Sequence, residues 1–246
     1  MRPDGRQALD LRPVQFEMSV NAHAEGSCRL TLGETVVLAT ASVEERIPPF
    51  LRGSGQGWVH AEYGMLPRAT HQRTPREATR GRPQGRTMEI QRLIARALRA
   101  VTRRELLGER TYVIDVDVLQ ADGGTRTAGI SAGFMALMQA VRRTTPEVRP
   151  FVDWLAAVSV GLAKGEVLLD LNFAEDSQID VDFNCAMTGT HQLVELQGSA
   201  EHGLFTVPQL GEIVTVCERG IDSLVDTMKR AFPEGAEAVG PTLGTC

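Results

Sequence analysis

Residues 115–127, which read DVDVLQADGGTRT, constrain the fold of this chain more than any other segment. Apolar residues alternate from Tyr112 to Leu119, which predicts a strand with one buried face. Two glycines follow, and an apolar helical pattern begins near Ala128. A strand that turns through glycines into a helix leaves backbone N–H groups unpaired at the helix start, where the helix dipole adds partial positive charge. We therefore expect this turn to bind an anion.

The residues of the turn suit a phosphate. Gly123 and Gly124 permit close approach of the backbone, and Arg126 carries a planar fork of donors that matches phosphate oxygens. The segment matches neither the GxxxxGK[ST] loop nor the GxGxxG turn, so it does not favour ATP or a dinucleotide. The alternative is an ordinary strand-to-helix turn in which Arg126 pairs with a neighbouring carboxylate.

Carboxylates gather in residues 175–182, which read EDSQIDVD. Asp180 and Asp182 are two residues apart, so on a strand their side chains share one face, and Asp176 in the preceding turn can fold back beside them. Such oxygen ligands suit Mg²⁺ or Mn²⁺. The alternative is a solvated acidic turn in which Asp176 caps the backbone. A metal beside a phosphate-binding turn favours phosphoryl or nucleotidyl transfer.

Charge is distributed unevenly along the chain. The 246 residues carry a net charge of −5. Residues 46–110 contain 14 arginines and five glutamates, a surplus of nine positive charges, which leaves −14 on the rest of the chain. This clustering predicts a polyanionic partner at one face of the molecule.

Periodicity and turn residues divide the chain into elements. Strands are expected within 11–20, 27–43, 112–119, 153–162, 166–172, 179–187 and 191–197, and helices at 87–101, 128–142 and 208–232. The segment 46–87 has little periodicity and is expected to form a long loop. The order ββ–αβα–ββββ–α predicts one α/β domain, of the α+β type, with mixed β-sheets and packed helices.

Cysteine usage and hydropathy indicate a cytoplasmic protein without a membrane segment. The four cysteines have no CxxC spacing, so neither a zinc site nor a disulfide framework is expected. The first residues are polar and do not resemble a signal peptide. The longest apolar stretch, 154–163, is about half of the roughly 20 residues that a membrane helix needs.

Several blocks of the sequence resemble bacterial ribonuclease PH. They are 2–6 (RPDGR), 57–70 (GWVHAEYGMLPRAT), 85–94 (GRTMEIQRLI), 119–127 (LQADGGTRT), 170–176 (DLNFAED), 187–190 (MTGT) and 194–198 (VELQG). The blocks follow the order of that family and extend the resemblance over residues 2–232. A single ribonuclease PH catalytic domain is therefore expected at 1–232. The segment 233–246, rich in Gly, Pro and Ala, is expected to be a flexible tail.

The resemblance implies a phosphate-dependent 3′→5′ exoribonuclease, or tRNA nucleotidyltransferase, that trims the 3′ ends of tRNA precursors. Inorganic phosphate would be the co-substrate, nucleoside diphosphates the products, and the transfer would be reversible. It also implies a divalent cation, Mg²⁺ or Mn²⁺, and a homohexamer built as a trimer of dimers.

Residue by residue, the resemblance implies three groups of site residues. The phosphate-binding residues are Arg86, Gly124, Thr125 and Arg126. The metal and acid–base residues are Asp176 and Asp182, with Asp180 nearby, so the catalytic set is Asp176, Asp182, Arg86 and Arg126. The RNA-contacting residues are Arg68, Arg73 and Arg76. One of the aspartates would protonate the leaving 3′ oxygen, directly or through metal-bound water, and Asp182 is the expected donor.

Two other classes of protein compete with this interpretation. A non-catalytic RNA-binding ring subunit would share the fold but would lack the phosphate and metal residues, which are all present here. A hydrolytic nuclease would use water and has no need of a phosphate-binding turn. Dependence on added phosphate separates these classes.

Overall fold

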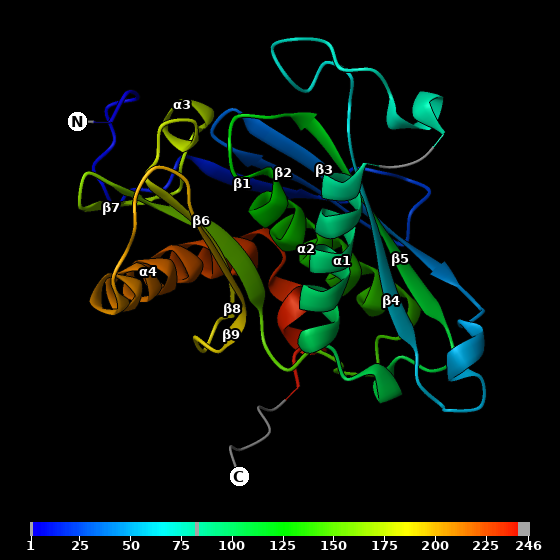
Figure 1. Cartoon of the computed structure of the whole chain (residues 1–246). Coiled ribbons are helices and arrows are strands. Elements are labelled where there is room, and N and C mark those ends of the chain that lie inside the picture. The colour runs from blue at the N-terminus through cyan, green and yellow to red at the C-terminus, as the bar shows by residue number, and fades with distance from the viewer. Residues whose placement is uncertain (1, 82–83, 241–246) are drawn as a thin grey trace.

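The computed structural model describes residues 2–81 and 84–240, which form two β-sheets with helices between and beside them (Figure 1). A five-stranded sheet has the order β1-β2-β3-β5-β4, and a four-stranded sheet has the order β7-β6-β8-β9. The strands are β1 (Val14–Met18), β2 (Gly26–Leu32), β3 (Thr35–Glu44), β4 (Trp58–Met65), β5 (Thr111–Gln120), β6 (Leu155–Ala163), β7 (Glu166–Leu169), β8 (Val181–Thr188) and β9 (Leu193–Ala200). The helices are α1 (Gly85–Ala100), α2 (Thr125–Thr144), α3 (Phe173–Asp176) and α4 (Val207–Ala231).

Helix α2 is the centre of the core. It contacts β2, β3 and β5 of the first sheet and β6 and β8 of the second. Its residues from Thr127 to Val141 are all buried, because it is apolar on nearly every side. Helix α1 lies beside α2 over β4, and α4 packs on β6 and β7 (Figure 1). Within the described residues, no helix combines the length and the apolar character needed to cross a bilayer.

Strand β5 follows the alternation in its sequence. Tyr112, Ile114, Val116 and Val118 are at most 1% exposed and face the helices. The strand pairs antiparallel with β3 and parallel with β4, so it lies inside the sheet and leads directly into α2. This arrangement places the glycine turn at the interface between the two sheets.

Strand β4 corrects the prediction of a long loop over 46–87. Its buried face is formed by Val59, Ala61 and Tyr63, and it is the edge strand beside β5. The buried face has three residues, one of them alanine, so its two-residue period is a weak signal among the surrounding arginines and glycines. Residues 82 and 83 of the predicted loop lie outside the described part of the chain.

The predicted flexible tail begins with residues that pack on the core. Pro233–Ala238 form a 3-10 helix (η4) that contacts α2 and α4, and Ala238 is fully buried. A bridge between Phe151 and Val239 continues the contact. Residues 241–246 of that prediction lie outside the described residues, and the expected domain boundary at residue 232 stays a prediction.

Candidate active site

A cleft of about 640 Å³ lies where the two sheets meet at the start of α2. Its walls come from the ends of β4 and β5, the first turns of α1 and α2, the short helix α3, and strands β6 and β8. The lining residues are Met65, Thr70, His71, Gln72, Thr74, Arg86, Ala121, Gly123, Gly124, Thr125, Arg126, Ser159, Phe173, Asp176, Asp182 and Asn184. The four predicted phosphate residues and both predicted metal residues therefore share one cavity.

The glycine turn requires its two glycines. Gly123 and Gly124 have φ values of 76° and 66°, in the left-handed region that other residues rarely adopt. A Cβ atom on Gly123 would lie 2.5 Å from the carbonyl oxygen of Leu171. Gly124 is the N-cap of α2, whose first residue is Thr125. The turn thus presses against the backbone that leads into α3.

Positive partial and full charges converge on the cleft from α1 and α2. The first N–H groups of each helix have no intrahelical partner, and neither first turn contains an acidic residue. Arg86 and Arg126 add two guanidinium groups. The Nη1 atom of Arg126 donates to the neutral amide oxygen of Gln197 at 3.1 Å. Within the described residues Arg126 forms no ion pair with a carboxylate. The alternative, in which Arg126 pairs with a neighbouring carboxylate in an ordinary turn, is therefore not observed among these residues.

Two carboxylates form the opposite wall. Asp176 ends α3, and Asp182 lies half-buried on β8 opposite Gly161 of β6. Loss of solvent raises the pKa of Asp182, and the neighbouring charge of Asp176 raises it further. Loss of solvent also raises the pKa of Asp176, which Arg126 and Arg86 partly oppose.

Asp180 is engaged away from this wall. Its Oδ2 atom accepts a hydrogen bond of 2.7 Å from the backbone N–H of Lys164, in the hairpin turn between β6 and β7. The two-residue spacing predicted a face shared with Asp182, but Asp180 precedes β8 and its carboxylate caps the hairpin instead.

The carboxylate pair fits one way of binding a divalent cation. The described residues contain no cluster of three or more His, Cys, Asp or Glu side chains that could form an all-protein cage. Mg²⁺, however, is usually held by one or two carboxylates together with waters and substrate phosphates. Two mutually repelling carboxylates that share a cleft with the glycine turn match that pattern.

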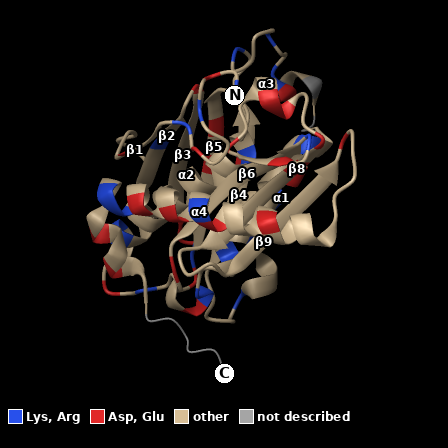
Figure 2. Cartoon of the chain, turned by 90° about the vertical axis from the view of Figure 1, so that its left-hand side faces the viewer, with Lys and Arg blue, Asp and Glu red and all other residues tan. Residues whose placement is uncertain are grey.

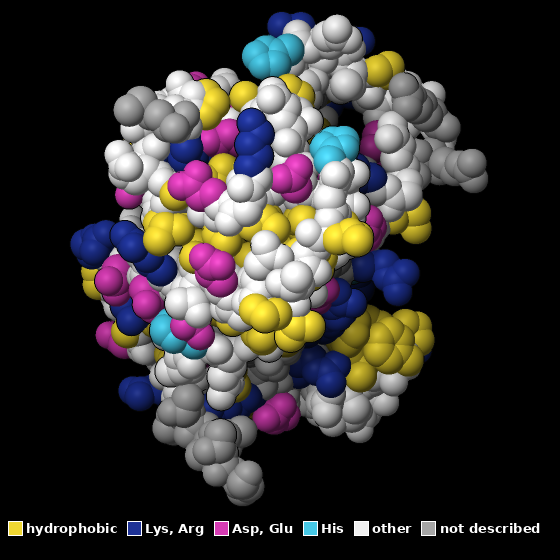
Figure 3. All heavy atoms as spheres, turned by 60° about the vertical axis from the view of Figure 1, so that its left-hand side comes forward, with side chains coloured by type: hydrophobic (Ala, Val, Ile, Leu, Met, Phe, Trp, Pro, Cys, Tyr) yellow, Lys and Arg dark blue, Asp and Glu magenta, His cyan; other side chains and the backbone are white. Residues whose placement is uncertain are grey.

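The three predicted RNA-contacting arginines lie at the rim. Arg68, Arg73 and Arg76 are exposed on the segment between β4 and α1, which reaches away from the body of the molecule (Figure 1). Figure 3 shows a hollow beneath this segment. Arg76 lines an adjoining cavity of about 550 Å³, and Arg68 donates to the carbonyl of His71 at 3.1 Å. The three arginines do not line the cleft that holds the glycine turn, and their contact with RNA stays a prediction.

Several lining residues were not found from the sequence. Asn184 donates to Asp182 at 3.0 Å, and its position two residues further along the same strand was a usable signal. Phe173 is 55% exposed, and its ring lies 6.4 Å from that of His71. Ser159 accepts a hydrogen bond from the N–H of Leu171 at 3.2 Å, and no pattern in the sequence predicts this contact.

Two family models match this chain. The model of the 3′ exoribonuclease family, domain 1, covers residues 10–142, and that of domain 2 covers residues 153–219. The chain belongs to the 3′ exoribonuclease family. Domain 1 contains the glycine turn and domain 2 contains the carboxylate wall, so the cleft joins the two parts that the family models describe.

Curated members of the family are similar over nearly the whole chain. Ribonuclease PH of Bacillus subtilis (strain 168) is 53% identical over 237 residues, which cover 94% of this chain and 97% of that one. Ribonuclease PH of Bacillus velezensis (strain DSM 23117 / BGSC 10A6 / LMG 26770 / FZB42) is 52% identical over 239 residues, 95% and 98% of the two chains. The recognition made from the sequence is confirmed: the chain is a phosphorolytic 3′→5′ exoribonuclease of the ribonuclease PH type.

Solved structures confirm the predicted fold class. The crystal structure of rice (Oryza sativa) Rrp46 matches with a TM-score of 0.76 at 20% identity, over 93% of this chain and 98% of that one. The Archaeoglobus fulgidus exosome with RNA bound to the active site matches with a TM-score of 0.78 at 22% identity, over 93% and 92%. At these identities the likeness concerns the mixed α/β fold alone.

Proposed function

We propose that this exoribonuclease trims the 3′ ends of tRNA precursors with inorganic phosphate bound at the turn formed by Gly124, Thr125 and Arg126. The observation that carries the proposal is the meeting, in one cleft, of two helix N-termini, two arginines and a pair of carboxylates. The arginine-bearing segment at the rim supports an extended polyanionic substrate. The tRNA substrate rests on the resemblance to ribonuclease PH.

The phosphate is the nucleophile in this proposal. Backbone N–H groups of Gly124 and Thr125 and the guanidinium groups of Arg86 and Arg126 would hold it. One of its oxygens attacks the terminal phosphodiester in line, the bond to the 3′ oxygen of the preceding nucleotide breaks, and a nucleoside diphosphate leaves. Two like charges about 4 Å apart repel by roughly 4 kcal/mol at an effective dielectric constant near 20. The two arginines offset this repulsion.

The carboxylates of Asp176 and Asp182 would bind the cation and supply the proton. Asp176 and Asp182 would hold a divalent cation, Mg²⁺ or Mn²⁺, which supplies neutralising charge to the phosphoryl oxygens when bound. We assign delivery of the proton to the leaving 3′ oxygen to Asp182, directly or through a water molecule, because Asp182 lines the cleft together with the glycine turn. The reaction exchanges one phosphoryl linkage for another, so nucleoside diphosphates should extend RNA when phosphate is scarce.

The quaternary structure and location belong to the same proposal. We propose a homohexamer, a trimer of dimers, in the cytoplasm. The same fold occurs in chains of archaeal exosome assemblies, which supports an oligomer. In a hexameric ring, the arginines of neighbouring chains would extend the RNA path around a central opening.

The first test uses a tRNA that carries a few extra 3′ nucleotides, incubated with the protein and Mg²⁺, with and without phosphate. Nucleoside diphosphates that form only with phosphate support the proposal. Nucleoside monophosphates formed without phosphate would indicate a hydrolase, and no products would indicate a binding subunit.

The phosphate site is tested by Arg126→Ala. Loss of a donor that stabilises transition-state charge typically lowers turnover by about 100–1,000-fold. We expect a loss of this size in phosphorolysis, with RNA binding retained in a filter-binding assay. Arg29→Ala is the control, because Arg29 pairs with Glu17 on the surface of the first sheet. Normal turnover by the Arg126 variant would show that phosphate binds elsewhere.

A further inference from the structure

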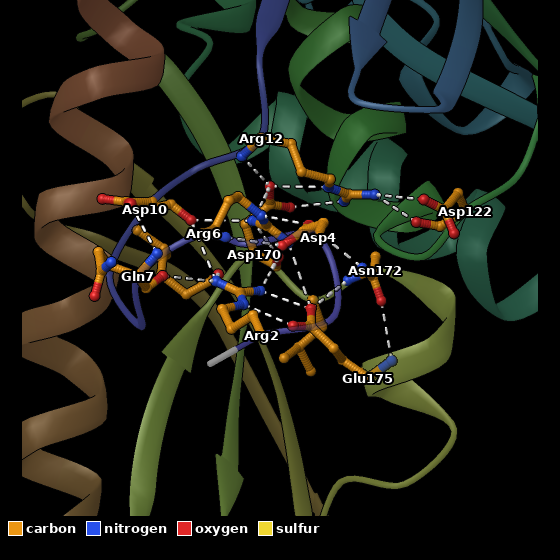
Figure 4. Close-up of polar contacts among 12 residues, drawn as sticks. Arg2, Asp4, Arg6, Gln7, Asp10, Arg12, Asp122, Asp170, Asn172 and Glu175 are labelled. Carbon is orange, nitrogen blue, oxygen red and sulfur yellow. Dashed lines mark hydrogen bonds and ion pairs between the residues drawn. The ribbon is translucent and has the colours of Figure 1, made fainter.

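The N-terminal residues 2–12 bring two buried arginines to the back of the cleft. Arg2 and Arg12 are 7% and 4% exposed, and neither lines the cavity. Each pairs through two hydrogen bonds with a buried carboxylate, Arg2 with Glu175 at 2.6 and 2.7 Å and Arg12 with Asp170 at 2.7 and 2.9 Å (Figure 4). Figure 2 shows acidic and basic residues gathered around this segment and α3. Burying charged groups costs free energy, and neither of these two ion pairs lines the cleft, so we ask what they hold in place.

Arg12 reaches the phosphate turn. Its Nη1 atom donates to the carbonyl oxygen of Asp122, the residue before the two glycines, and lies 3.7 Å from the Asp122 carboxylate. A Cβ atom on Gly124 would lie 3.2 Å from its Nη2 atom, so the guanidinium packs directly against the turn. Thr35 completes the support: its hydroxyl accepts from the N–H of Asp122 at 3.0 Å and donates to the carbonyl of Gly123 at 2.7 Å.

Arg2 reaches the carboxylate wall. Its partner Glu175 belongs to a capping box with Asn172, in which each side chain accepts from the backbone N–H of the other at 3.0 Å. The next residue is Asp176, whose N–H donates to the carbonyl of Asn172 at 2.9 Å. Helix α3 has four residues, too few to be stable on its own. Glu175 is held by Arg2 through two hydrogen bonds and by Arg6 through a weaker contact of 3.4 Å, so Arg2 is the main anchor for the position of Asp176.

The two arginines are linked to each other through Asp170. Arg2 donates to the Asp170 carbonyl at 2.8 Å, while Arg12 holds its carboxylate and donates its own N–H to it at 2.8 Å. Asp170 has a φ of 57°, in the left-handed region that costs energy for a residue with a side chain. The Asp122 carboxylate also accepts from the N–H of Phe173 at 3.2 Å, which joins the turn to the first residue of α3.

We propose that Arg12 and Arg2 are positioning residues, with Arg12 fixing the phosphate turn and Arg2, through Glu175, fixing Asp176. The proposal rests on the proposed function, because it assumes phosphate at the turn and a cation at Asp176. It adds that the two arginines act separately: Arg12 affects the affinity for phosphate, and Arg2 affects the affinity for the cation. Arginines that only held the two halves together would affect both equally.

Arg12→Lys tests the first half. Lysine keeps the charge but is a point donor, so it cannot hold the Asp170 carboxylate through two bonds and also reach Asp122. At metal sites, loss of an outer contact typically costs about 10–100-fold in affinity or activity, and we expect a change of the same order at the phosphate turn. We expect the KM for phosphate, and the Kd for inorganic phosphate in equilibrium dialysis, to rise by about that factor. The Kd for Mn²⁺, followed by the electron paramagnetic resonance of the free ion, should stay within about twofold.

Arg2→Lys tests the second half, in the opposite sense. The Kd for Mn²⁺ should rise by about 10–100-fold, because Glu175 loses its two-bond pair with Arg2 and keeps the 3.4 Å contact with Arg6, which holds Asp176 less firmly. The Kd for phosphate in the absence of metal should change little. The matched control is Arg29→Lys. Arg29 is also paired with a carboxylate, that of Glu17, through three hydrogen bonds, but it lies on the exposed face of the first sheet. It should change neither constant.

The outcomes separate the inference from the proposed function. If Arg126→Ala binds phosphate normally, the phosphate site itself is wrongly placed. If Arg126→Ala loses phosphate and Arg12→Lys does not, the positioning role is wrong while the site stands. The inference would also be wrong if Arg12→Lys and Arg2→Lys each raised the Kd for phosphate and the Kd for Mn²⁺ by the same factor. Should Arg12→Lys fail to fold, Asp122→Asn, which removes the charge next to Arg12 but keeps an acceptor for Phe173, should raise the Kd for phosphate selectively, and an unchanged Kd would refute the role.

Discussion

At the scale of single residues, the site is built at the expense of stability. Asp182 is half-buried next to Asp176, and two carboxylates in one wall repel each other. In the folded protein the pKa of Asp182 is raised, so the folded state binds a proton more tightly than the unfolded chain does. The ionised carboxylate therefore destabilises the fold above its raised pKa. The penalty disappears as the pH falls through that value to the ordinary pKa of aspartate.

Asp182→Asn should consequently stabilise the free protein while it abolishes phosphorolysis. We expect its Tm at neutral pH to rise by about 2–4 °C, the shift that about 1 kcal/mol produces in a chain of this size. The gain should shrink as the pH is lowered towards about 4. Thermal unfolding at several pH values measures it, with Asp226→Asn on the exposed surface of α4 as the control. A gain that does not depend on pH would contradict the explanation.

At the scale of elements, the two sheets approach each other through α2, and the packing on this helix sets the distance between them. Both sheets pack on α2, and its first turn forms one side of the candidate active site. Strand β2 lies so close to it that a Cβ atom on Gly26 would be 2.0 Å from the carbonyl oxygen of Ala136. The neighbouring atoms are backbone, which cannot move aside as a flexible side chain can.

Gly26→Ala should therefore force β2 and α2 apart. Overfilling a packed core costs about 1–3 kcal/mol, and we expect at least this loss of unfolding free energy in urea. Gly211→Ala is the matched control, because Gly211 lies within α4 and a Cβ atom there meets nothing within 4 Å. It should gain about 0.5–1 kcal/mol, since alanine loses less entropy than glycine in a helix. Similar effects of the two substitutions would show that the close contact is not important.

At the scale of the whole molecule, charge is separated in a way that suits an RNA substrate. The chain is negative overall, but 14 arginines lie in residues 46–110, which include the segment at the rim of the cleft. Arg68, Arg73 and Arg76 stand on that segment in the exposed position that phosphate contacts require. Their role in RNA binding stays a prediction.

Replacing Arg68, Arg73 and Arg76 with alanine should weaken RNA binding and reduce its salt dependence. Each phosphate contact on a single strand contributes about 0.7 to the slope of log Kd against log salt concentration, so three contacts contribute about 2. Binding titrations at several salt concentrations measure the slope. The charge-matched control replaces Arg29, Arg46 and Arg230, none of which lines either cavity. An unchanged slope in the first variant would exclude these arginines from the RNA path.

The sequence by itself determined the family and most of the elements. The alternation of β5, the apolar stripe of α1 and the nearly uniform apolar character of α2 each record which faces are buried, and burial is a local property of an element. The glycine turn was predictable because backbone conformation is also a local property, and left-handed conformations select glycine. The edge strand β4 was missed because its buried face is short.

Only the tertiary structure decided which residues meet. Arg86, the turn at Gly124 and the carboxylates at Asp176 and Asp182 come from distant parts of the chain, and their convergence depends on the packing of both sheets against α2. The same packing directed Asp180 to the hairpin. It also buried Arg2 and Arg12 behind the site. Spacing along a chain fixes which residues share a face of one element, whereas the distances between elements are fixed by the side chains that fill the space between them.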